Sequence, residues 1–479
     1  MLDDDRSAQI PRERRIFANR TLNLRSIQAV GYDMDYTLVH YRPELWEERA
    51  YARIRTLLAD EGWPVADLAF DASSVIRGLI IDNELGNVVK ANRFGYVIRA
   101  AHGTRMMSFG EQRDVYRHTP VELSDPRFFF VNTLFSLSET CLYAQLVDLF
   151  DAGRLAGVTG YEDLFRKVRA VLDRAHIEGT LKAEILSDPG RFIDLDAEAP
   201  LALVDQRRAG RRLMLITNAE WTYAREIMTF AFDRFLEPGS SWRDLFELVI
   251  VGARKPDFFT RDLPLFRIVD EDAGLLTPIP DRYPGPGAYV GGDATRVETY
   301  LGLTGSQILY VGDHVFADVR MSKASLRWRT ALILRELEDE LKAIDGIRNL
   351  EAELARLMAD KERLEAHHCA ARIELQRLTK GYPPPPERSA AELESELDSL
   401  WAQMEALDQQ IAPLAKRATE ISNPLWGTPL RSGYDISHLA RQVERSADVY
   451  TSRVSNFLHA TPFAYLRAKR SAMPHDVET

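Results

Sequence analysis

Two carboxylates one residue apart stand at the end of the first apolar run, where residues 31–38 read Gly-Tyr-Asp-Met-Asp-Tyr-Thr-Leu. Residues two apart in an extended chain point to the same side, so Asp33 and Asp35 can be aimed at one point. One acid can attack an electrophile covalently while the other moves a proton, and a divalent cation can offset their mutual repulsion. The pair therefore predicts a site of covalent, metal-assisted group transfer.

Three further polar motifs follow later apolar runs. In chain order they are Thr217-Asn218, Lys255-Pro256 and Gly312-Asp313-His314. Taken singly, each is typical of an ordinary turn after a strand, and a loop lysine is usually solvated. Their occurrence with the Asp pair, each just after a predicted strand, favours a shared chemical role.

The apolar runs before these motifs are short, nearly continuous and rich in aliphatic residues. They cover residues 27–32, 212–216, 248–251 and 307–311, and a similar run follows at 330–334. Continuous apolar strands suit a parallel sheet buried on both faces, and helical stretches lie between some of them. We therefore predict an α/β fold with a Rossmann-like parallel sheet, whose ligands bind beyond the carboxyl ends of the strands.

The side chains that follow these strands fit phosphoryl transfer, which needs an in-line nucleophile and neutralisation of the phosphate oxygens. Asp33 would form an aspartyl phosphate, and Asp35 would protonate the leaving oxygen and later activate water. Thr217, with backbone N–H groups near Asn218, would hold phosphate oxygens. Lys255 would neutralise charge between the nucleophile and the phosphate.

A magnesium ion is predicted at the same place, because hard cations prefer carboxylate and carbonyl oxygens. Asp313 would hold Mg²⁺ together with Asp33 and the backbone carbonyl of Asp35. Asp318 would orient these ligands from the second layer.

Composition limits the other classes of function. The chain has 479 residues, enough for two to three domains, and a formal net charge of −11 at pH 7. That charge disfavours general binding to nucleic acid or to anionic membranes, and the two distant cysteines predict neither a disulfide framework nor a cysteine-rich metal cluster. An acidic N-terminus without an apolar signal core, and no apolar run long enough to span a bilayer, lead us to expect a soluble, cytoplasmic protein.

The ordered motifs resemble those of the haloacid-dehalogenase-like phosphohydrolase superfamily. A finer resemblance is to the cytosolic purine 5′-nucleotidases, whose nucleophile motif also reads Asp-Met-Asp-Tyr-Thr-Leu. Further phrases that carry it are residues 15–20 (RIFANR), 101–103 (AHG), 132–135 (NTLF), 253–256 (ARKP), 312–316 (GDHVF) and 473–475 (MPH). The resemblance implies a haloacid-dehalogenase-type core and Mg²⁺-dependent hydrolysis of purine nucleoside monophosphates, with IMP or GMP favoured. The resemblance also implies a second activity, the transfer of phosphate to a nucleoside (nucleoside phosphotransferase).

Roughly 180 residues separate the first motif from the second, far more than a crossover connection requires. We predict that residues 91–199 form an inserted cap that closes over the crevice and excludes water. Within it, residues 164–176 predict an amphipathic helix with one apolar stripe.

Polar residues of this helix and its exit are candidates for contact with base and ribose. They are Arg169, Asp173, His176 and Lys182. Composition alone favours a solvated flank with an Arg–Asp pair, whereas the resemblance implies that they hold the nucleotide. Phe135 is by itself typical of a core residue, and the resemblance places it near the nucleotide. Ser136 and Ala219 stand where the family carries an asparagine and a hydroxyl residue, which leaves the base preference open.

Leucine-rich series with helical spacing flank a Gly-Tyr-Pro-Pro-Pro-Pro segment at residues 381–386. Proline cannot continue the first helix, so we predict an antiparallel helical hairpin that serves packing or subunit contact. We accordingly expect a homo-oligomer, either a dimer or a tetramer. The predicted domains are a catalytic core of residues 1–90 and 200–335 completed by 420–479, the cap at 91–199, and the hairpin at 336–419.

The resemblance also implies a nucleotide effector site. Phe316, Gln442 and Arg445 match its aromatic residue and its Gln/Arg pair, whereas Ser446 replaces an expected aromatic residue. Control by a nucleotide effector therefore stays open.

Two rival functions remain beside a purine 5′-nucleotidase. One is a phosphatase for another phosphomonoester, such as a sugar phosphate, and the other is a catalytically silent scaffold protein. The complete set of Asp33, Asp35, Lys255 and Asp313 favours an enzyme, because a silent core does not need paired acids beside a lysine.

Overall fold

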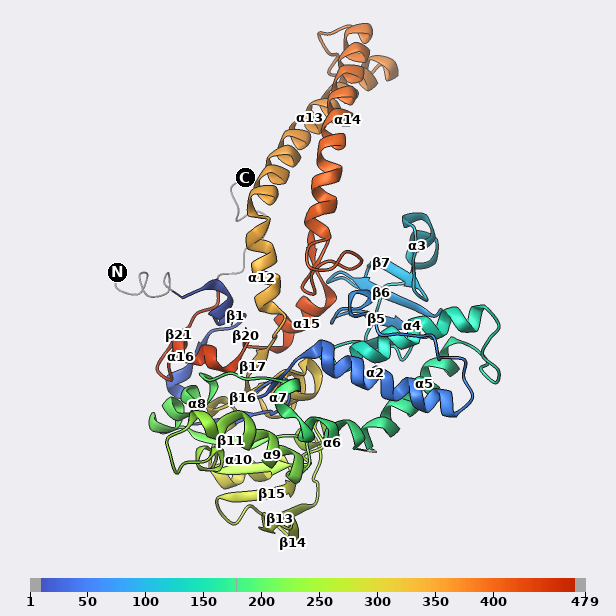
Figure 1. Cartoon of the computed structure of the whole chain (residues 1–479). Helices are drawn as coiled ribbons and strands as arrows, with labels where there is room; N and C mark the ends of the chain where they lie inside the picture. The colour runs from blue at the N-terminus through green and yellow to red at the C-terminus, as the bar shows by residue number, and fades with distance from the viewer. Residues whose placement is uncertain (1–9, 178, 470–479) are drawn as a thin grey trace. The chain divides into compact units, whose positions relative to one another are not determined.

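The computed structural model describes residues 10–177 and 179–469, without the side chains of residues 176 and 177, and it divides the chain into two compact units (Figure 1). The first unit comprises residues up to 338 and from 429 onward. The second unit comprises residues 339–428.

The first unit is built on a mostly parallel sheet, which has ten strands among the described residues, in the order β1-β20-β17-β16-β3-β11-β12-β15-β13-β14. The strands of its parallel part are β20 (Val449–Thr451), β17 (Arg329–Ile333), β16 (Ile308–Gly312), β3 (Ala29–Tyr32), β11 (Arg212–Ile216), β12 (Leu248–Val251) and β15 (Gly287–Gly291). Antiparallel strands flank them, namely β1 (Phe17–Ala18) at one edge and β13 (Leu265–Asp270) with β14 (Leu275–Ile279) at the other. The predicted α/β fold with a parallel sheet is confirmed.

Both faces of this sheet are buried, which explains why its strands are continuously apolar. Val30 and Leu213 pack into one core cluster with α8 (Ala199–Arg208) and α9 (Trp221–Phe232). Ala29 and Met214, one residue away along the same strands, pack into a second cluster with α10 (Ala294–Leu301). The predicted runs at 212–216 and 248–251 coincide with β11 and β12.

A second, antiparallel sheet lies between the first and second motifs of the sequence. It has the order β8-β7-β6-β5-β9. Its strands are β5 (Ile80–Asp82), β6 (Asn87–Ala91), β7 (Val97–His102), β8 (Arg105–Met106) and β9 (Phe128–Phe130). The helices α2 (Pro43–Asp60), α4 (Leu137–Asp151) and α5 (Tyr161–Ile177) pack against one another in the same unit. The predicted start of the cap, residue 91, falls inside this sheet.

The second unit contains two long helices, α13 (Arg348–Lys380) and α14 (Ala390–Thr419), which pack against each other. Gly381 ends α13 in the left-handed conformation (φ 68°), which glycine adopts without a steric penalty. Leu354, Leu357 and Ile411 form a buried cluster between the helices. The predicted helical hairpin is confirmed.

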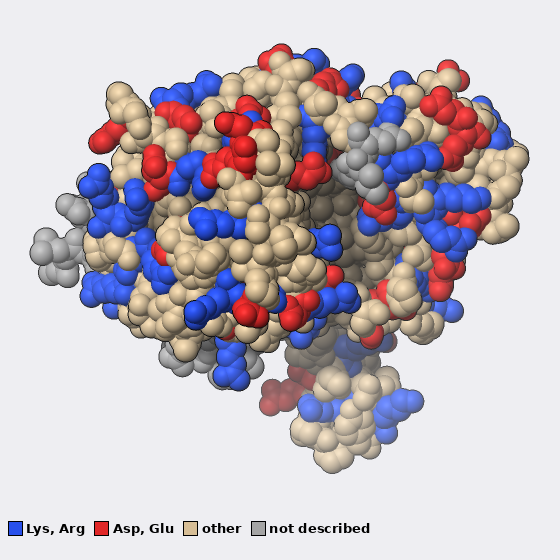
Figure 2. Space-filling view, turned by 90° about the horizontal axis from the view of Figure 1, so that it is seen from below, with Lys and Arg blue, Asp and Glu red and all other residues tan. Residues whose placement is uncertain are grey.

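Charged side chains of both signs are interspersed over the face of the molecule drawn in Figure 2, and that face is hollowed near its centre. Basic and acidic groups therefore neutralise one another locally on this face. No helix among the described residues is long and apolar enough to cross a membrane.

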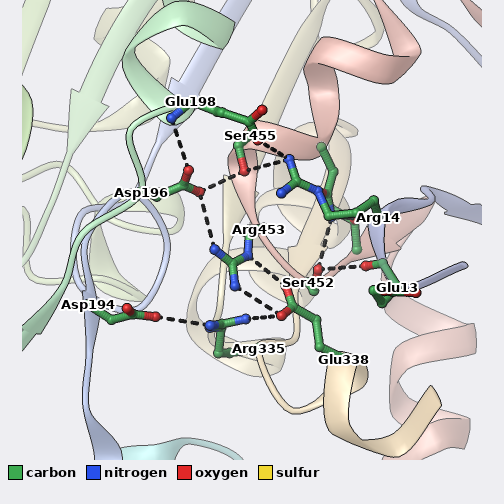
Figure 3. Close-up of polar contacts among 12 residues, drawn as sticks. Glu13, Arg14, Asp194, Asp196, Glu198, Arg335, Glu338, Ser452, Arg453 and Ser455 are labelled. Atoms are coloured by element: carbon green, nitrogen blue, oxygen red, sulfur yellow. Dashed lines mark hydrogen bonds and ion pairs between the residues drawn. The ribbon is translucent and has the colours of Figure 1, made fainter. Parts of the chain in front are cut away.

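A polar junction of Asp194, Arg335, Glu338 and Arg453 joins three segments that are far apart in sequence (Figure 3). Arg453, just after β20, donates to both carboxylate oxygens of Glu338 at 2.6 and 2.9 Å. Arg335, just after β17, also pairs with Glu338, and it lies 3.0 Å from Asp194 of β10 (Ile193–Asp194). The junction thus ties β10, which lies just before α8, to the ends of β17 and β20.

Substitution of Glu338 would measure how much this junction stabilises the fold. Burial raises the pKa of its carboxyl, but Arg453 and Arg335 more than offset this and lower the pKa to about 2, from an ordinary 4.5. A lowered pKa in the folded state stabilises the protein above the unfolded-state pKa, and this contribution is lost as pH falls. We expect Glu338→Gln to lower the free energy of unfolding by about 1–3 kcal/mol at pH 7, and by less at pH 4. Urea unfolding measures both values, and an equal difference at the two pH values would contradict the prediction.

The hairpin provides a second test, on stability alone. Leu400 is buried on α14, whereas its neighbour Trp401 is 63% exposed. An aspartate at residue 400 would bury an unpaired charge, so Leu400→Asp should lower the melting temperature or change the sedimentation coefficient. Trp401→Asp is the matched control and should leave the melting temperature nearly unchanged. Identical melting curves for the two variants would show that the helix faces have been misassigned.

Candidate active site

The four motifs meet at one edge of the central sheet, because the strands that carry them are neighbours. β16, β3, β11 and β12 lie side by side and run parallel. Asp33, Thr217 and Asp313 directly follow β3, β11 and β16, and Lys255 lies four residues beyond β12. The carboxyl ends of parallel strands share one edge of a sheet, which is where open α/β folds bind ligands.

Lys255 is a buried charge of this edge, with its side chain 3% exposed. Its Nζ lies 2.7 Å from Asp33 Oδ1, 2.8 Å from Asp318 Oδ1 and 3.1 Å from the hydroxyl of Tyr310. Burial lowers the pKa of Lys255, but Asp318 and Asp33 more than offset this and raise it well above its ordinary value. The lysine is therefore a permanent positive charge beside the predicted nucleophile.

Three buried carboxylates gather around this lysine. One carboxylate oxygen each from Asp33, Asp313 and Asp318 lies within 4.8 Å of the other two. Burial and the neighbouring carboxylates raise the pKa of Asp33, to about 7, and that of Asp313, although Lys255 counteracts the rise at Asp33. Within the described residues, Asp313 Oδ2 is buried without a hydrogen-bond partner. These mutually repelling carboxylates and the unbonded Asp313 Oδ2 fit a metal site, because a divalent cation would offset the repulsion and give that oxygen a partner.

The Gly-Asp-His motif has a separate structural reason for each residue. A Cβ on Gly312 would lie 2.6 Å from Cβ, Cγ and Oδ2 of Asp318, so only glycine leaves room for that acid. The backbone N–H of His314 donates to Asp318 Oδ2 at 3.1 Å. Nδ1 of the same histidine accepts from two backbone N–H groups at the start of the short π-helix η9 (Val315–Arg320). Burial lowers the pKa of His314 to about 4, which keeps the ring neutral and able to accept.

Asn218 has a contact that the sequence did not indicate. Its Oδ1 accepts from the backbone N–H of Lys255 at 2.6 Å, and its Nδ2 donates to the carbonyl of the same residue at 3.1 Å. Oγ1 of the neighbouring Thr217 accepts from the N–H of Ala219 at 3.1 Å. The amide of Asn218 thus clamps the lysine backbone, while its predicted phosphate contact stays a prediction.

Asp35 is partly buried and has a tyrosine partner. The hydroxyl of Tyr41 donates to Asp35 Oδ1 at 2.6 Å and lies 2.9 Å from the hydroxyl of Tyr223. Burial raises the pKa of Asp35, and the bond from Tyr41 counteracts that rise. Nothing in the sequence marked either tyrosine, because their only signal is a place in an apolar segment.

The predicted nucleotide-binding residues have distinct surroundings. Arg169 pairs with the buried carboxylate of Glu139 at 3.1 Å, and its guanidinium lies 4.8 Å from the ring centroid of Phe129. Asp173 is exposed on the same helix, α5. The side chain of His176 lies outside the described residues.

Lys182 lies beside the start of α9, and Phe135 lies beside the segment that carries the first motif. The ammonium of Lys182, on α6 (Thr180–Ser187), lies 3.5 Å from Glu220 Oε1 and 5.6 Å from the ring centroid of Tyr223. Phe135 packs edge-on against Tyr36, three residues after Asp33, with ring centroids 4.7 Å apart. Its role as a nucleotide contact stays a prediction.

Arg77 is a buried residue of this edge; residues 77–79 (RGL) also match the family's phrases, but sequence reasoning assigned Arg77 no role in the site. Its guanidinium donates to the backbone carbonyl of Asp313 at 2.5 Å and to that of Asn132 at 2.9 Å. It also lies 3.3 Å from a carboxylate oxygen of Glu336. Arg77 therefore joins the loop that carries Asp313 to the segment that precedes Phe135, and no local pattern could have shown this.

The predicted effector residues occupy two packed elements. Phe316 is 42% exposed on η9, and η9 packs against α15 (His438–Ser446). Gln442 is buried on α15, and Arg445 is exposed on the same helix. Binding of an effector between them stays a prediction.

Gly312 allows a direct test of the carboxylate cluster. Gly312→Ala must displace the side chain of Asp318, which then loses its contacts with His314 and Lys255. We expect lower hydrolysis of every phosphomonoester, including p-nitrophenyl phosphate, and a smaller rise in melting temperature on addition of Mg²⁺. Gly110→Ala is the matched control, because a Cβ there meets only Ser108 Oγ at 4.0 Å. Unchanged Mg²⁺ stabilisation in Gly312→Ala would rule out this role for Asp318.

Comparison with known proteins agrees with these motifs. A model of the 5′ nucleotidase family matches residues 16–478. A 5′-nucleotidase domain-containing protein of Dictyostelium discoideum is 25% identical over 478 residues, which cover 96% of this chain and 74% of the relative.

Two solved structures are also similar. A β-phosphoglucomutase of Pyrococcus sp. strain ST 04 shares 9% identity at a TM-score of 0.32, over 64% of this chain and 87% of its own. A haloacid dehalogenase-like family hydrolase of Xanthomonas campestris shares 14% identity at a TM-score of 0.25, over 64% of this chain and 82% of its own. Both TM-scores are too low to support a conclusion. The family model, in contrast, spans nearly the whole chain, so this protein belongs to the 5′ nucleotidase family of hydrolases.

Proposed function

We propose that this protein is a Mg²⁺-dependent 5′-nucleotidase that hydrolyses purine nucleoside 5′-monophosphates, with IMP and GMP favoured, through an aspartyl phosphate on Asp33. The observation that carries the proposal is the buried contact of Lys255 with Asp33, at 2.7 Å, inside the carboxylate cluster. A nucleophile beside a fixed cation and an acid cluster matches the needs of phosphoryl transfer. Family membership supports a nucleotide as the substrate.

The metal would be held by Asp33, Asp313 and the backbone carbonyl of Asp35, with Asp318 behind them. Carboxylate and carbonyl oxygens are the ligands that Mg²⁺ prefers. A bound divalent cation would neutralise charge on the phosphate and on the acids.

Asp33 attacks in the first step. Its Oδ1 is fixed by the backbone N–H of Met34 at 2.8 Å and by Lys255, so the attacking atom is Oδ2. A bond forms between Oδ2 and phosphorus as the bond from phosphorus to O5′ breaks. Asp35 gives its proton to O5′, and the nucleoside leaves as a neutral alcohol.

Water reverses this chemistry in the second step. Asp35, now ionised, takes a proton from water, whose oxygen attacks phosphorus and displaces the Asp33 carboxylate. Thr217 and Lys255 hold the phosphate oxygens in both steps. A nucleoside hydroxyl in place of this water would give the phosphotransferase reaction.

The cap side of the proposal relies on Arg169, whose guanidinium is held between the carboxylate of Glu139 and the ring of Phe129. A held guanidinium can donate to the acceptor atoms of an oxygenated purine at a low entropic cost. A phosphatase for sugar phosphates would not need such a group. Homo-oligomer formation and a cytoplasmic location remain predictions from the sequence.

A substrate panel tests the proposal. With Mg²⁺ present, the wild type should hydrolyse IMP and GMP at a higher kcat/KM than sugar phosphates. Asp33→Asn keeps the shape of the side chain but removes the attacking carboxylate, so turnover should fall by orders of magnitude and no phosphoenzyme should form. Preference for a sugar phosphate would favour the alternative phosphatase, and wild-type-like turnover in Asp33→Asn would exclude the mechanism.

Two variants within the same panel separate the cap from the phosphate site. Arg169→Ala should lower kcat/KM for IMP roughly ten- to a hundredfold, the effect of a lost charged hydrogen bond, but leave p-nitrophenyl phosphate nearly unaffected. Lys255→Ala should impair both substrates alike. Equal losses on both substrates for Arg169→Ala would mean that this residue only maintains the structure of the cap.

A further inference from the structure

We propose that Tyr41 and Tyr223 are positioning residues, which hold Asp35 with one carboxylate oxygen bound and the other free to exchange a proton with the leaving group. This inference rests on the proposed function of Asp35 as acid and base, and it assigns a role to two residues outside the sequence motifs. The two hydroxyls and the carboxylate form one hydrogen-bonded row, Tyr223–Tyr41–Asp35.

The direction of the hydrogen bonds in this row follows from the number of protons available. Asp35, when ionised, can only accept, so the single hydroxyl proton of Tyr41 is used on Oδ1 at 2.6 Å. The oxygen of Tyr41 then accepts the hydroxyl proton of Tyr223 across 2.9 Å. Oδ1 is thereby engaged, and Oδ2 is the atom left for the proton transfer.

The fold places Tyr41 firmly. It lies on β4 (His40–Tyr41), which pairs with β10 through Tyr41 and Ile193. Its ring packs against Tyr36 and Trp46, with centroids 5.4 and 5.1 Å apart, and the residue is 2% exposed. A hydroxyl on such a locked ring can fix a carboxylate within the small tolerance that proton transfer requires.

The outer end of the row faces a cation. Tyr223 lies on α9, and the ammonium of Lys182 stands 5.6 Å from its ring centroid. Lys182 belongs to α6, within the predicted cap of residues 91–199, and its partner Glu220 lies just before α9. The row therefore leads from the acid–base residue to α6 of the predicted cap.

Buried tyrosines also serve packing alone, so the test needs a readout that packing does not change. Proton donation matters for a poor leaving group, such as the alkoxide of a nucleotide or a sugar, and hardly matters for p-nitrophenolate. kcat/KM reports the steps up to phosphoenzyme formation, before Asp35 acts as a base on water. The ratio of kcat/KM for an alkyl phosphate to that for p-nitrophenyl phosphate therefore isolates leaving-group protonation.

The experiment compares Tyr41→Phe and Tyr223→Phe with the wild type on IMP, ribose 5-phosphate and p-nitrophenyl phosphate. We expect Tyr41→Phe to lower kcat/KM for the alkyl phosphates roughly ten- to a hundredfold and that for p-nitrophenyl phosphate less than about twofold. Tyr223→Phe should change the ratio in the same direction by a smaller factor. Tyr32→Phe is the matched control, because its hydroxyl makes an equally short buried bond, 2.6 Å to Gln206 Oε1, away from Asp35.

Three results would overturn the inference: an unchanged ratio in Tyr41→Phe, a ratio changed equally by Tyr32→Phe, or a change confined to Tyr223→Phe. If Tyr41→Phe fails to fold, an unchanged ratio in Tyr223→Phe overturns it. The same substrates distinguish a failure of the proposed function from a failure of this inference. A wild type that hydrolyses ribose 5-phosphate but not IMP refutes the nucleotide substrate and still tests the tyrosines on an alkyl phosphate. A wild type inactive on all three substrates overturns both.

Discussion

The ammonium of Lys255 lies among buried carboxylates, and the arrangement of the candidate site depends on that contact. Asp33 directly follows strand β3 and Asp318 lies on the π-helix η9, and without the lysine their charges would repel each other at the end of the sheet. Removing one partner of such a group leaves an uncompensated buried charge, which is why the surrounding residues also secure the lysine. Asn218 clamps its backbone and Tyr310 contacts its Nζ. Lys255 compensates only part of the acidic charge, and the remainder is what makes the site suited to a divalent cation.

Much of the fold and the central part of the site could be predicted from the sequence, for a physical reason. Strands buried on both faces must be apolar at every position, so residues 212–216 and 248–251 were recognisable as β11 and β12. A polar residue placed directly after such a strand reaches the carboxyl edge of the sheet wherever the strand lies. The positions of Asp33, Thr217 and Asp313 after their strands therefore followed from local sequence. The order of the strands brings them together, since β16, β3 and β11 are neighbours.

The partners of these residues could not be predicted in the same way. Arg77 and Asp313 are 236 positions apart, and Tyr41 and Tyr223 are 182 apart, so no spacing rule connects them. Glu139 illustrates a second difficulty, because a carboxylate in an apolar helix looks unremarkable until Arg169 is found beside it. The antiparallel sheet of β5–β9 went unpredicted because no catalytic motif follows its strands. Local patterns identify groups that react, whereas the groups that orient them become visible only when distant segments are in contact.

The pairing of β20 between β17 and β1 has a consequence for how this protein is made. Phe17 and Tyr450 are register partners, although more than four hundred residues separate them. On the ribosome, β17 is synthesised before the helical hairpin and therefore waits with one open edge until residues 449–451 emerge. An unpaired strand edge invites association with other chains, and long-range pairing of this kind is slow. Premature termination after the hairpin would therefore leave the complete set of motif residues in a core whose sheet is unfinished and whose edge is open to other chains.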